Sequence, residues 1–110
     1  MTSLYDRLTE EQKARLSFKY LSLNPSAIHL LEENLDKVDW EMLSENPSAI
    51  PILEENLDKV DWNILATNPA AIHLLAANID ELDLDLDYKF WEHLSQNTAL
   101  FDPIYEYVIK

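Results

Sequence analysis

The feature that most constrains this chain is a ten-residue block that occurs twice without change. Residues 31–40 read LEENLDKVDW, and the same ten letters return at residues 53–62, an offset of 22 residues. A fixed offset of this size is typical of proteins that repeat one small structural unit and stack its copies. The repetition therefore predicts an array of similar units.

The register extends beyond the identical block and defines three copies. Asn-Pro pairs open them at Asn24, Asn46 and Asn68. An aromatic residue stands six positions before each asparagine, and Trp91 keeps this spacing before Asn97 after an insertion of seven residues. We divide the chain, taken as one domain of residues 1–110, into an N-terminal cap 1–23, copies 24–45, 46–67 and 68–96, and a C-terminal capping segment 97–110.

Each copy is predicted to form two short helices. Asparagine followed by proline is a strong helix start, because the Asn side chain accepts a free backbone N–H and the fixed φ of proline suits the first turn. In the first copy this predicts one helix over residues 25–33. A second, capped by Asp36 or Asp39, carries Trp40 and Leu43 on its inner face.

The turns must be made without glycine, because the chain has none. Asparagine is the residue that best replaces glycine where a helix ends in the left-handed conformation. We expect that conformation at the asparagine that follows the first helix in each copy, namely Asn34, Asn56 and Asn78.

Helices this short are not stable alone, so the copies must stack to bury their apolar faces. The predicted fold is all-α, a short α-solenoid of stacked two-helix repeats with a capping helix at each end. Trp62 in the central copy should line the core, and Trp62→Ala should cost roughly 3–5 kcal/mol.

The N-terminal cap is predicted from a capping box at Thr9 to Gln12, followed by one longer amphipathic helix through Ala14, Phe18 and Leu21. At the other end, Asp102-Pro103 should start a final helix from residue 104 to residue 109. It either folds back over the last copy or docks on another chain as a homo-oligomer contact made by Ile104, Tyr105, Tyr107, Val108 and Ile109.

Composition excludes several classes of function. The 21 acidic and 8 basic residues give a net charge of −13, which repels nucleic acid and anionic membranes and attracts basic proteins. Without cysteine or glycine, thiol catalysis, cysteine-built zinc sites and phosphate-cradling loops are excluded. No apolar stretch could span a bilayer and no signal-peptide pattern is present, so we expect an intracellular protein, cytoplasmic or nuclear.

The residues that could take part in catalysis or metal binding recur in successive copies, as ordinary surface residues of a repeat do. Paired carboxylates return at the same position in successive copies, whereas a catalytic pair is built once. His29 and His73 are equivalent positions two copies apart, too distant to share a metal ion, and His93 has no partner in register. We therefore expect neither an enzyme nor a cofactor.

The insertion in the third copy alternates leucine with aspartate. Asp83, Asp85 and Asp87 match positions 1, 3 and 5 of a calcium-binding loop, but Tyr88 and Leu94 stand where glycine and glutamate are required. The pattern favours a solvated loop and leaves cation binding open.

The motif N-P-x-A-I-x-L-L-E-x-N-x-D-K-V-D-W-x-x-L-S, over about residues 18–97, resembles short tandem repeats found in many proteins of large DNA viruses that infect algae and amoebae. The resemblance implies a scaffold and a viral origin, without a settled biochemical activity. This chain has Leu35, Leu57 and Ile79 where proline is common, and its third copy lacks the lysine and the in-register tryptophan. Near-identity of two copies would also suit an engineered consensus array.

The function that we expect is a non-catalytic protein-binding module or scaffold with a basic partner. Its contact candidates are positions that vary between copies, together with the acidic insertion: His29, Pro51 and His73; Glu41, Asn63 and Glu92; Asp83, Asp85 and Asp87. The alternative is an acidic inhibitor that imitates DNA and occupies the binding groove of a nucleic-acid-binding protein.

Overall fold

The computed structural model describes residues 1–82 and 86–104, and every regular element in these ranges is a helix. The α-helices are α1 (Leu4–Arg7), α2 (Glu10–Lys13), α3 (Phe18–Leu21), α4 (Ile28–Glu32), α5 (Trp40–Glu45), α6 (Ile50–Glu54), α7 (Trp62–Leu65), α8 (Ile72–Leu82) and α9 (Tyr88–Ser95). The 3-10 helices are η1 (Pro25–Ala27), η2 (Leu35–Lys37), η3 (Leu57–Lys59) and η4 (Pro69–Ala71). The predicted all-α class is confirmed.

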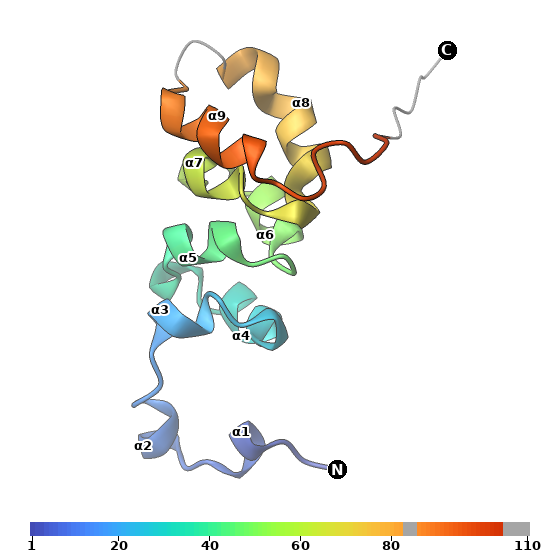
Figure 1. Cartoon of the computed structure of the whole chain (residues 1–110). Helices are drawn as coiled ribbons and strands as arrows, with labels where there is room; N and C mark the ends of the chain where they lie inside the picture. Colours follow the sequence, from blue (N-terminus) through green and yellow to red (C-terminus); the bar gives the residue numbers. More distant parts are fainter. Residues whose placement is uncertain (83–85, 105–110) are drawn as a thin grey trace, which may run out of the picture.

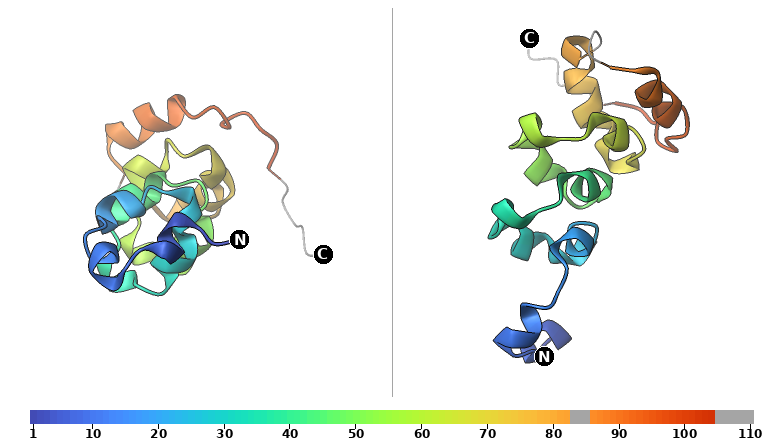
Figure 2. Two further views of the ribbon diagram at one scale, coloured as in Figure 1. Left: turned by 90° about the horizontal axis from the view of Figure 1, so that it is seen from below. Right: turned by 90° about the vertical axis from the view of Figure 1, so that its left-hand side faces the viewer.

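The helices follow one another along a single long axis. Figure 1 shows α4, α6 and α8 along one side and α3, α5, α7 and α9 along the other. Seen along the axis, helices of successive copies overlie one another (Figure 2, left). The extents are 49 × 32 × 23 Å. The Cα radius of gyration is 16.1 Å, against roughly 13 Å for a compact chain of this length, so the molecule is elongated.

The Asn-Pro pairs start helices as predicted at Asn24 and Asn68, whereas Asn46-Pro47 lies in a turn and α6 starts only at Ile50. The side chains of Asn24, Asn46 and Asn68 each accept a hydrogen bond from the backbone N–H two residues later, at 2.9 to 3.0 Å. In the first and third copies a 3-10 turn opens the first helix, which continues as α4 or α8. Of the two candidate caps for the second helix, Asp39 takes the role, because its Oδ1 accepts from the N–H of Met42 at 3.0 Å.

The asparagines that follow the first helices differ from the prediction. Asn34 has φ −138° and Asn56 has φ −137°, and no described residue has a positive φ. Instead, Nδ2 of Asn34, Asn56 and Asn78 donates to the carbonyl oxygen four residues earlier, at 2.8 Å in each case. At Asn34 and Asn56 the side chain replaces a backbone donor that is missing beyond the helix end, so no left-handed residue is needed, whereas Asn78 lies within α8.

The third copy has a longer first helix than the other two. α8 runs through Asn78 to Leu82, whereas α4 and α6 end before the equivalent asparagines. Ala76 and Ala77 replace the glutamate pair of the earlier copies. Alanine has the highest helix propensity, which favours continuation over a turn.

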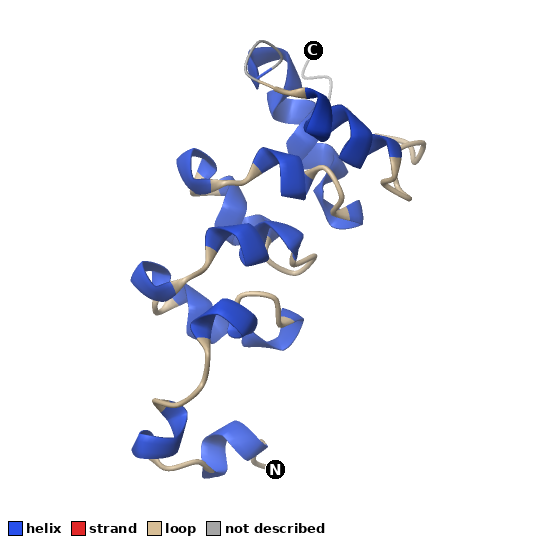
Figure 3. Cartoon of the chain, turned by 60° about the vertical axis from the view of Figure 1, so that its left-hand side comes forward, coloured by secondary structure: helices blue, strands red, loops and turns tan. Residues whose placement is uncertain are grey.

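The single N-terminal helix predicted from the sequence is wrong. Ser3, Thr9 and Ser17 each accept a hydrogen bond from the backbone N–H three residues later and so each start a new helix. These side chains compete with helical carbonyl groups for backbone N–H donors, and the segment is therefore divided into α1, α2 and α3. The predicted capping box is confirmed, since Gln12 Oε1 accepts from the Thr9 N–H at 2.9 Å. Figure 3 shows the loop that separates α2 from α3.

The core is built from leucines at equivalent positions. Leu31, Leu53 and Leu75 on the first helices are at most 4% exposed. Leu43 and Leu65 on the second helices are fully buried. These leucines belong to one hydrophobic cluster that includes residues of all three copies.

The tryptophans are less buried than predicted. Trp40 and Trp62 pack against the core but are half-buried, and Trp91 is 42% exposed. Lys59 Nζ lies 5.3 Å from the centre of the Trp40 ring. The tryptophan at this position therefore faces the following copy and is partly covered by a charged side chain.

A serine joins α3 to the residue before α5 and another joins α5 to the residue before α7, whereas Ala66 stands at the equivalent position after α7. Ser22 Oγ accepts from the N–H of Asp39, and Ser44 Oγ accepts from the N–H of Asp61, both at 3.0 Å and across 17 residues. Each hydroxyl also donates to the carbonyl four residues before it. Both serines are fully buried, so these bonds satisfy groups that water does not reach.

The asparagines that open the second and third copies, and Asn97 after the third copy, also hold the part of the chain before them. Asn68 Nδ2 donates to the carbonyl oxygens of Ser44 at 3.1 Å and Asn46 at 3.2 Å. Asn97 makes the equivalent pair with Ala66 at 2.9 Å and Asn68 at 3.1 Å. One side chain thus caps a helix with its oxygen and fastens the preceding copy with its nitrogen.

The C-terminal prediction is only partly within the described residues. Ile104 is 44% exposed and lies outside any helix. The rest of the helix predicted there, and of the oligomer contact through Tyr105, Tyr107, Val108 and Ile109, lies outside the described residues.

Candidate functional site

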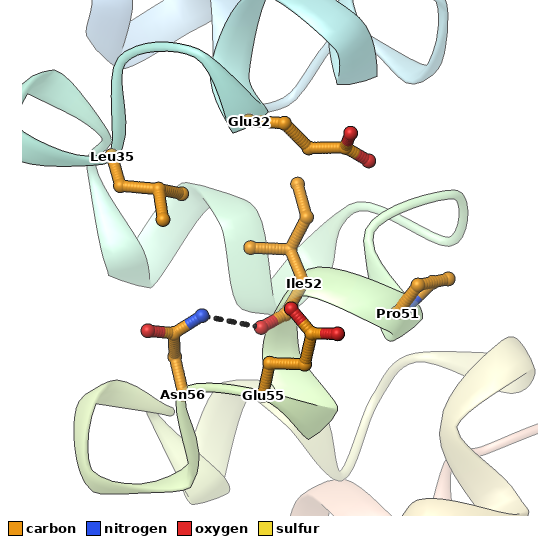
Figure 4. A pocket seen from close by; sticks show the side chains of 6 residues that line it. All are labelled: Glu32, Leu35, Pro51, Ile52, Glu55 and Asn56. Carbon is orange, nitrogen blue, oxygen red and sulfur yellow. Dashed lines mark hydrogen bonds between the residues drawn. The ribbon is translucent and has the colours of Figure 1, made fainter.

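A groove of about 230 Å³ lies between the first and second copies, where η2 and α4 meet α6 (Figure 4). Two elements of the first copy supply one wall, and α6 with the residues after it supplies the other. The residues that line the groove are Glu32, Leu35, Pro51, Ile52, Glu55 and Asn56.

The groove combines an apolar floor with an acidic rim. Ile52 is 4% exposed, and Figure 4 shows it between Glu32 and Glu55. Both glutamates are exposed, and none of the residues that line the groove is basic. Asn56 Nδ2 donates to the carbonyl of Ile52 at 2.8 Å, which fixes the end of α6. The arrangement can hold a chain that is apolar along its length and positively charged at its end.

The first set of sequence-predicted contacts is exposed but spread along the molecule. His29, Pro51 and His73 lie on α4, α6 and α8, one on each first helix. Pro51 lines the groove. His29 lines a separate cavity of about 480 Å³ between the α1 region and α4. The structure therefore does not bring these three residues into one site.

The second set lies on the other column of helices. Glu41 and Glu92 are exposed on α5 and α9. Asn63 is half-buried on α7, and its carbonyl oxygen lies 2.7 Å from Nδ1 of His93, a hydrogen bond that joins α7 to α9. The main chain of Asn63 is thus part of the packing between copies.

The acidic insertion is described only in part. Asp87 caps α9, because its Oδ1 accepts from the N–H groups of Lys89 at 2.9 Å and Phe90 at 3.3 Å. Asp83 and Asp85, and with them the proposed cation loop, lie outside the described residues.

Sequence reasoning missed most of the groove. It interpreted the glutamate pairs as solvated surface because they recur, it assigned no role to Ile52, and it gave Asn56 a role only in the turn after the first helix. Glu32 and Glu55 come from different copies, 23 residues apart, and meet only across the junction. The repeat itself was the available signal, because stacked copies bring residues of one copy close to residues near the equivalent position in the next copy.

No group of three or more metal-ligating side chains comes together in residues 1–82 and 86–104. In the same part of the chain, no helix has the length and apolar character needed to cross a membrane. Comparison of the chain with protein-family models, curated proteins and solved structures finds no match.

Proposed function

We propose that the chain is a short α-solenoid with a 22-residue period that binds a basic protein partner without catalysing a reaction. The period is supported by hydrogen bonds that recur between copies, since the Ser22 and Ser44 hydroxyls each accept across the same 17 residues. Stacked repeats present an extended surface that can be adapted to a partner, which supports the binding role.

The observation that carries this proposal is the groove between the first two copies. Its floor at Ile52 suits the aliphatic stem of a lysine or arginine, and the carboxylates of Glu32 and Glu55 suit the charged head. The net charge of −13 would attract a basic partner from a distance and speed association.

The experiment compares two double variants that change net charge equally. Glu32→Gln with Glu55→Gln removes both groove carboxylates. Glu45→Gln with Glu54→Gln removes two exposed carboxylates that do not line the groove. A basic partner captured from cell extract is identified and then titrated against both proteins by calorimetry. The proposal requires a clear loss of affinity for the groove variant alone.

The alternative function is an acidic inhibitor that imitates DNA. Its support is the distribution of charge, which is −5, −3 and −5 over residues 24–45, 46–67 and 68–96, but +1 over residues 1–23. The negative field thus follows the copies. An inhibitor of this kind depends on the summed field and not on one groove.

The same two variants separate the functions. A DNA-imitating inhibitor loses similar affinity in both, competes with DNA, and weakens steeply as salt screens the field over about 10 Å at 0.1 M. A groove-binding module distinguishes the variants and is less sensitive to salt. We further propose a viral or engineered origin, supported by the repeat motif. We also propose an intracellular location, cytoplasmic or nuclear, with which the lack of cysteine is compatible.

A further inference from the structure

Inside the array, neighbouring copies contact each other through two surfaces, one from each copy. Each end of the array exposes one of these surfaces, which we call the N-terminal half and the C-terminal half of the contact. Asn24 belongs to the N-terminal half. Its counterparts Asn46, Asn68 and Asn97 are 0%, 1% and 5% exposed and donate to carbonyls of the preceding copy. Asn24 is exposed, and among the described residues its amide donates no hydrogen bond, although its oxygen accepts from the N–H two residues later as in its counterparts.

Tyr20 shows the same contrast one turn earlier. Its counterparts Met42, Ile64 and His93 are half-buried, and His93 contacts the carbonyl of Asn63 on the preceding second helix. Tyr20 occupies this backward-facing position on α3, where no second helix precedes it, and is 66% exposed.

The C-terminal half is visible on α9. Ser95 Oγ donates to the carbonyl of Trp91 at 2.7 Å, as Ser22 and Ser44 do within their own helices. Those two are fully buried and each accept an N–H from the next copy, whereas Ser95 is exposed and accepts none from the described residues. Trp91, at the forward-facing aromatic position, is 42% exposed.

The ends also differ in charge. Residues 1–23 carry four basic and three acidic residues, a net charge of +1, whereas residues 68–96 carry one basic and six acidic residues, a net charge of −5. Opposite charges at the two ends favour contact between unlike ends and disfavour contact between two acidic ends.

The segment before α3 lies beyond the N-terminal half at that end of the long axis (Figure 1) but packs against it only loosely. Neither α1 nor α2 contains a buried residue. A cavity of about 480 Å³, lined in part by Tyr5, Asn24 and Leu30, remains between this segment and α4. Tyr20 and Asn24 are exposed even with the segment in place.

We propose that a second copy of this chain completes the open junction, so that molecules associate head to tail. The loosely packed α1 and α2 move aside, and the α3 face of one molecule, with Tyr20 and Asn24, stacks on the α9 face of another, with Trp91 and Ser95. Asn24 Nδ2 then donates to the Asn97 carbonyl of its neighbour, as Asn97 donates to Asn68 within the chain. A contact between unlike faces does not close on itself and generates open chains of molecules.

Sedimentation equilibrium of the full chain, over concentrations up to the millimolar range, tests the proposal. The average mass should rise with concentration beyond that of a dimer. A protein that stays monomeric throughout, or that stops at a closed dimer, would overturn the proposal.

Two variants test the faces separately. Tyr20→Glu blocks the head and Trp91→Glu blocks the tail, while Leu57→Glu, at a residue 39% exposed on η3, controls for loss of apolar surface. Each blocked variant should remain monomeric alone, and their equimolar mixture should form a dimer, because the free tail of one meets the free head of the other. Leu57→Glu should associate like the unmodified chain.

A mixture that stays monomeric, or a Leu57→Glu variant that dissociates as fully as the others, contradicts the assigned faces. Circular dichroism of each variant shows whether it is folded. If Trp91→Glu unfolds, Ser95→Glu takes its place, because that side chain is exposed and lies on the same face.

Discussion

The Asn68 side chain and the Ser44 carbonyl, 24 residues apart, form a buried hydrogen bond of 3.1 Å across the junction of two copies. The same side chain accepts from the N–H of Ala70 at 3.0 Å. A single residue therefore starts one copy and fastens the previous one, which couples local helix formation to stacking.

Asn68→Asp is expected to lower the free energy of unfolding by about 3 kcal/mol, because the cap survives while two donated hydrogen bonds are lost and a carboxylate faces buried carbonyls. The matched control is Asn24→Asp, at an exposed position whose amide has no partner among the described residues. In dilute solution that change should stay within about 0.5 kcal/mol. Urea denaturation measures both, and equal losses would show that the amide does not join the copies.

Ser44→Ala is expected to cost about 1–2 kcal/mol, because the N–H of Asp61 loses its acceptor in a buried place. Ser95→Ala removes the same hydroxyl where no described N–H depends on it, and should change stability by no more than about 0.5 kcal/mol. Thermal unfolding measures the change in stability of both variants. A larger loss for Ser95→Ala than for Ser44→Ala would contradict the role of Ser44 at the junction between copies.

The burial of Trp62 revises the cost expected from the sequence. Since the ring is half-buried, Trp62→Ala should cost about 2–3 kcal/mol, less than expected for a fully buried tryptophan. Trp91→Ala, at 42% exposure, should cost less than Trp62→Ala. Guanidinium denaturation measures the loss of stability in both variants. A larger loss for Trp91→Ala than for Trp62→Ala would mean that burial of the ring does not determine the loss.

The local elements of this fold were predictable because their signals are local. Asn24 and Asp39 start helices through bonds to residues two and three positions away, and the sequence shows both partners. The N-terminal cap was mispredicted because an apolar spacing of i, i+4, i+7 was weighted above the serine at position 17, which starts a new helix.

The candidate site was less predictable, because it depends on which residues meet between copies. The repeat located variable positions such as Pro51, which does line the groove. It did not reveal that Glu32 and Glu55 approach the same floor, since that follows from how far one copy is rotated against the next. Nor did the recurrence of serine indicate its role at the junction, because the Asp39 N–H that it binds is 17 residues away.

The last prediction concerns Asn56, where the order of stability of the unmodified protein and two variants decides between two backbone conformations. With φ −137° and ψ 48°, Asn56 does not adopt the left-handed conformation that glycine would favour, and its side chain bonds the carbonyl of Ile52. Asn56→Ala should therefore cost about 1 kcal/mol for the lost bond. Asn56→Gly should cost a further 0.5 to 1 kcal/mol, roughly, because glycine loses more backbone entropy on folding. A left-handed residue would give a different order, with glycine at least as stable as asparagine and alanine the least stable. Chemical denaturation of the three proteins at one pH measures their free energies of unfolding and distinguishes the two conformations. Their net charges are equal, so only the side-chain amide and the backbone freedom differ.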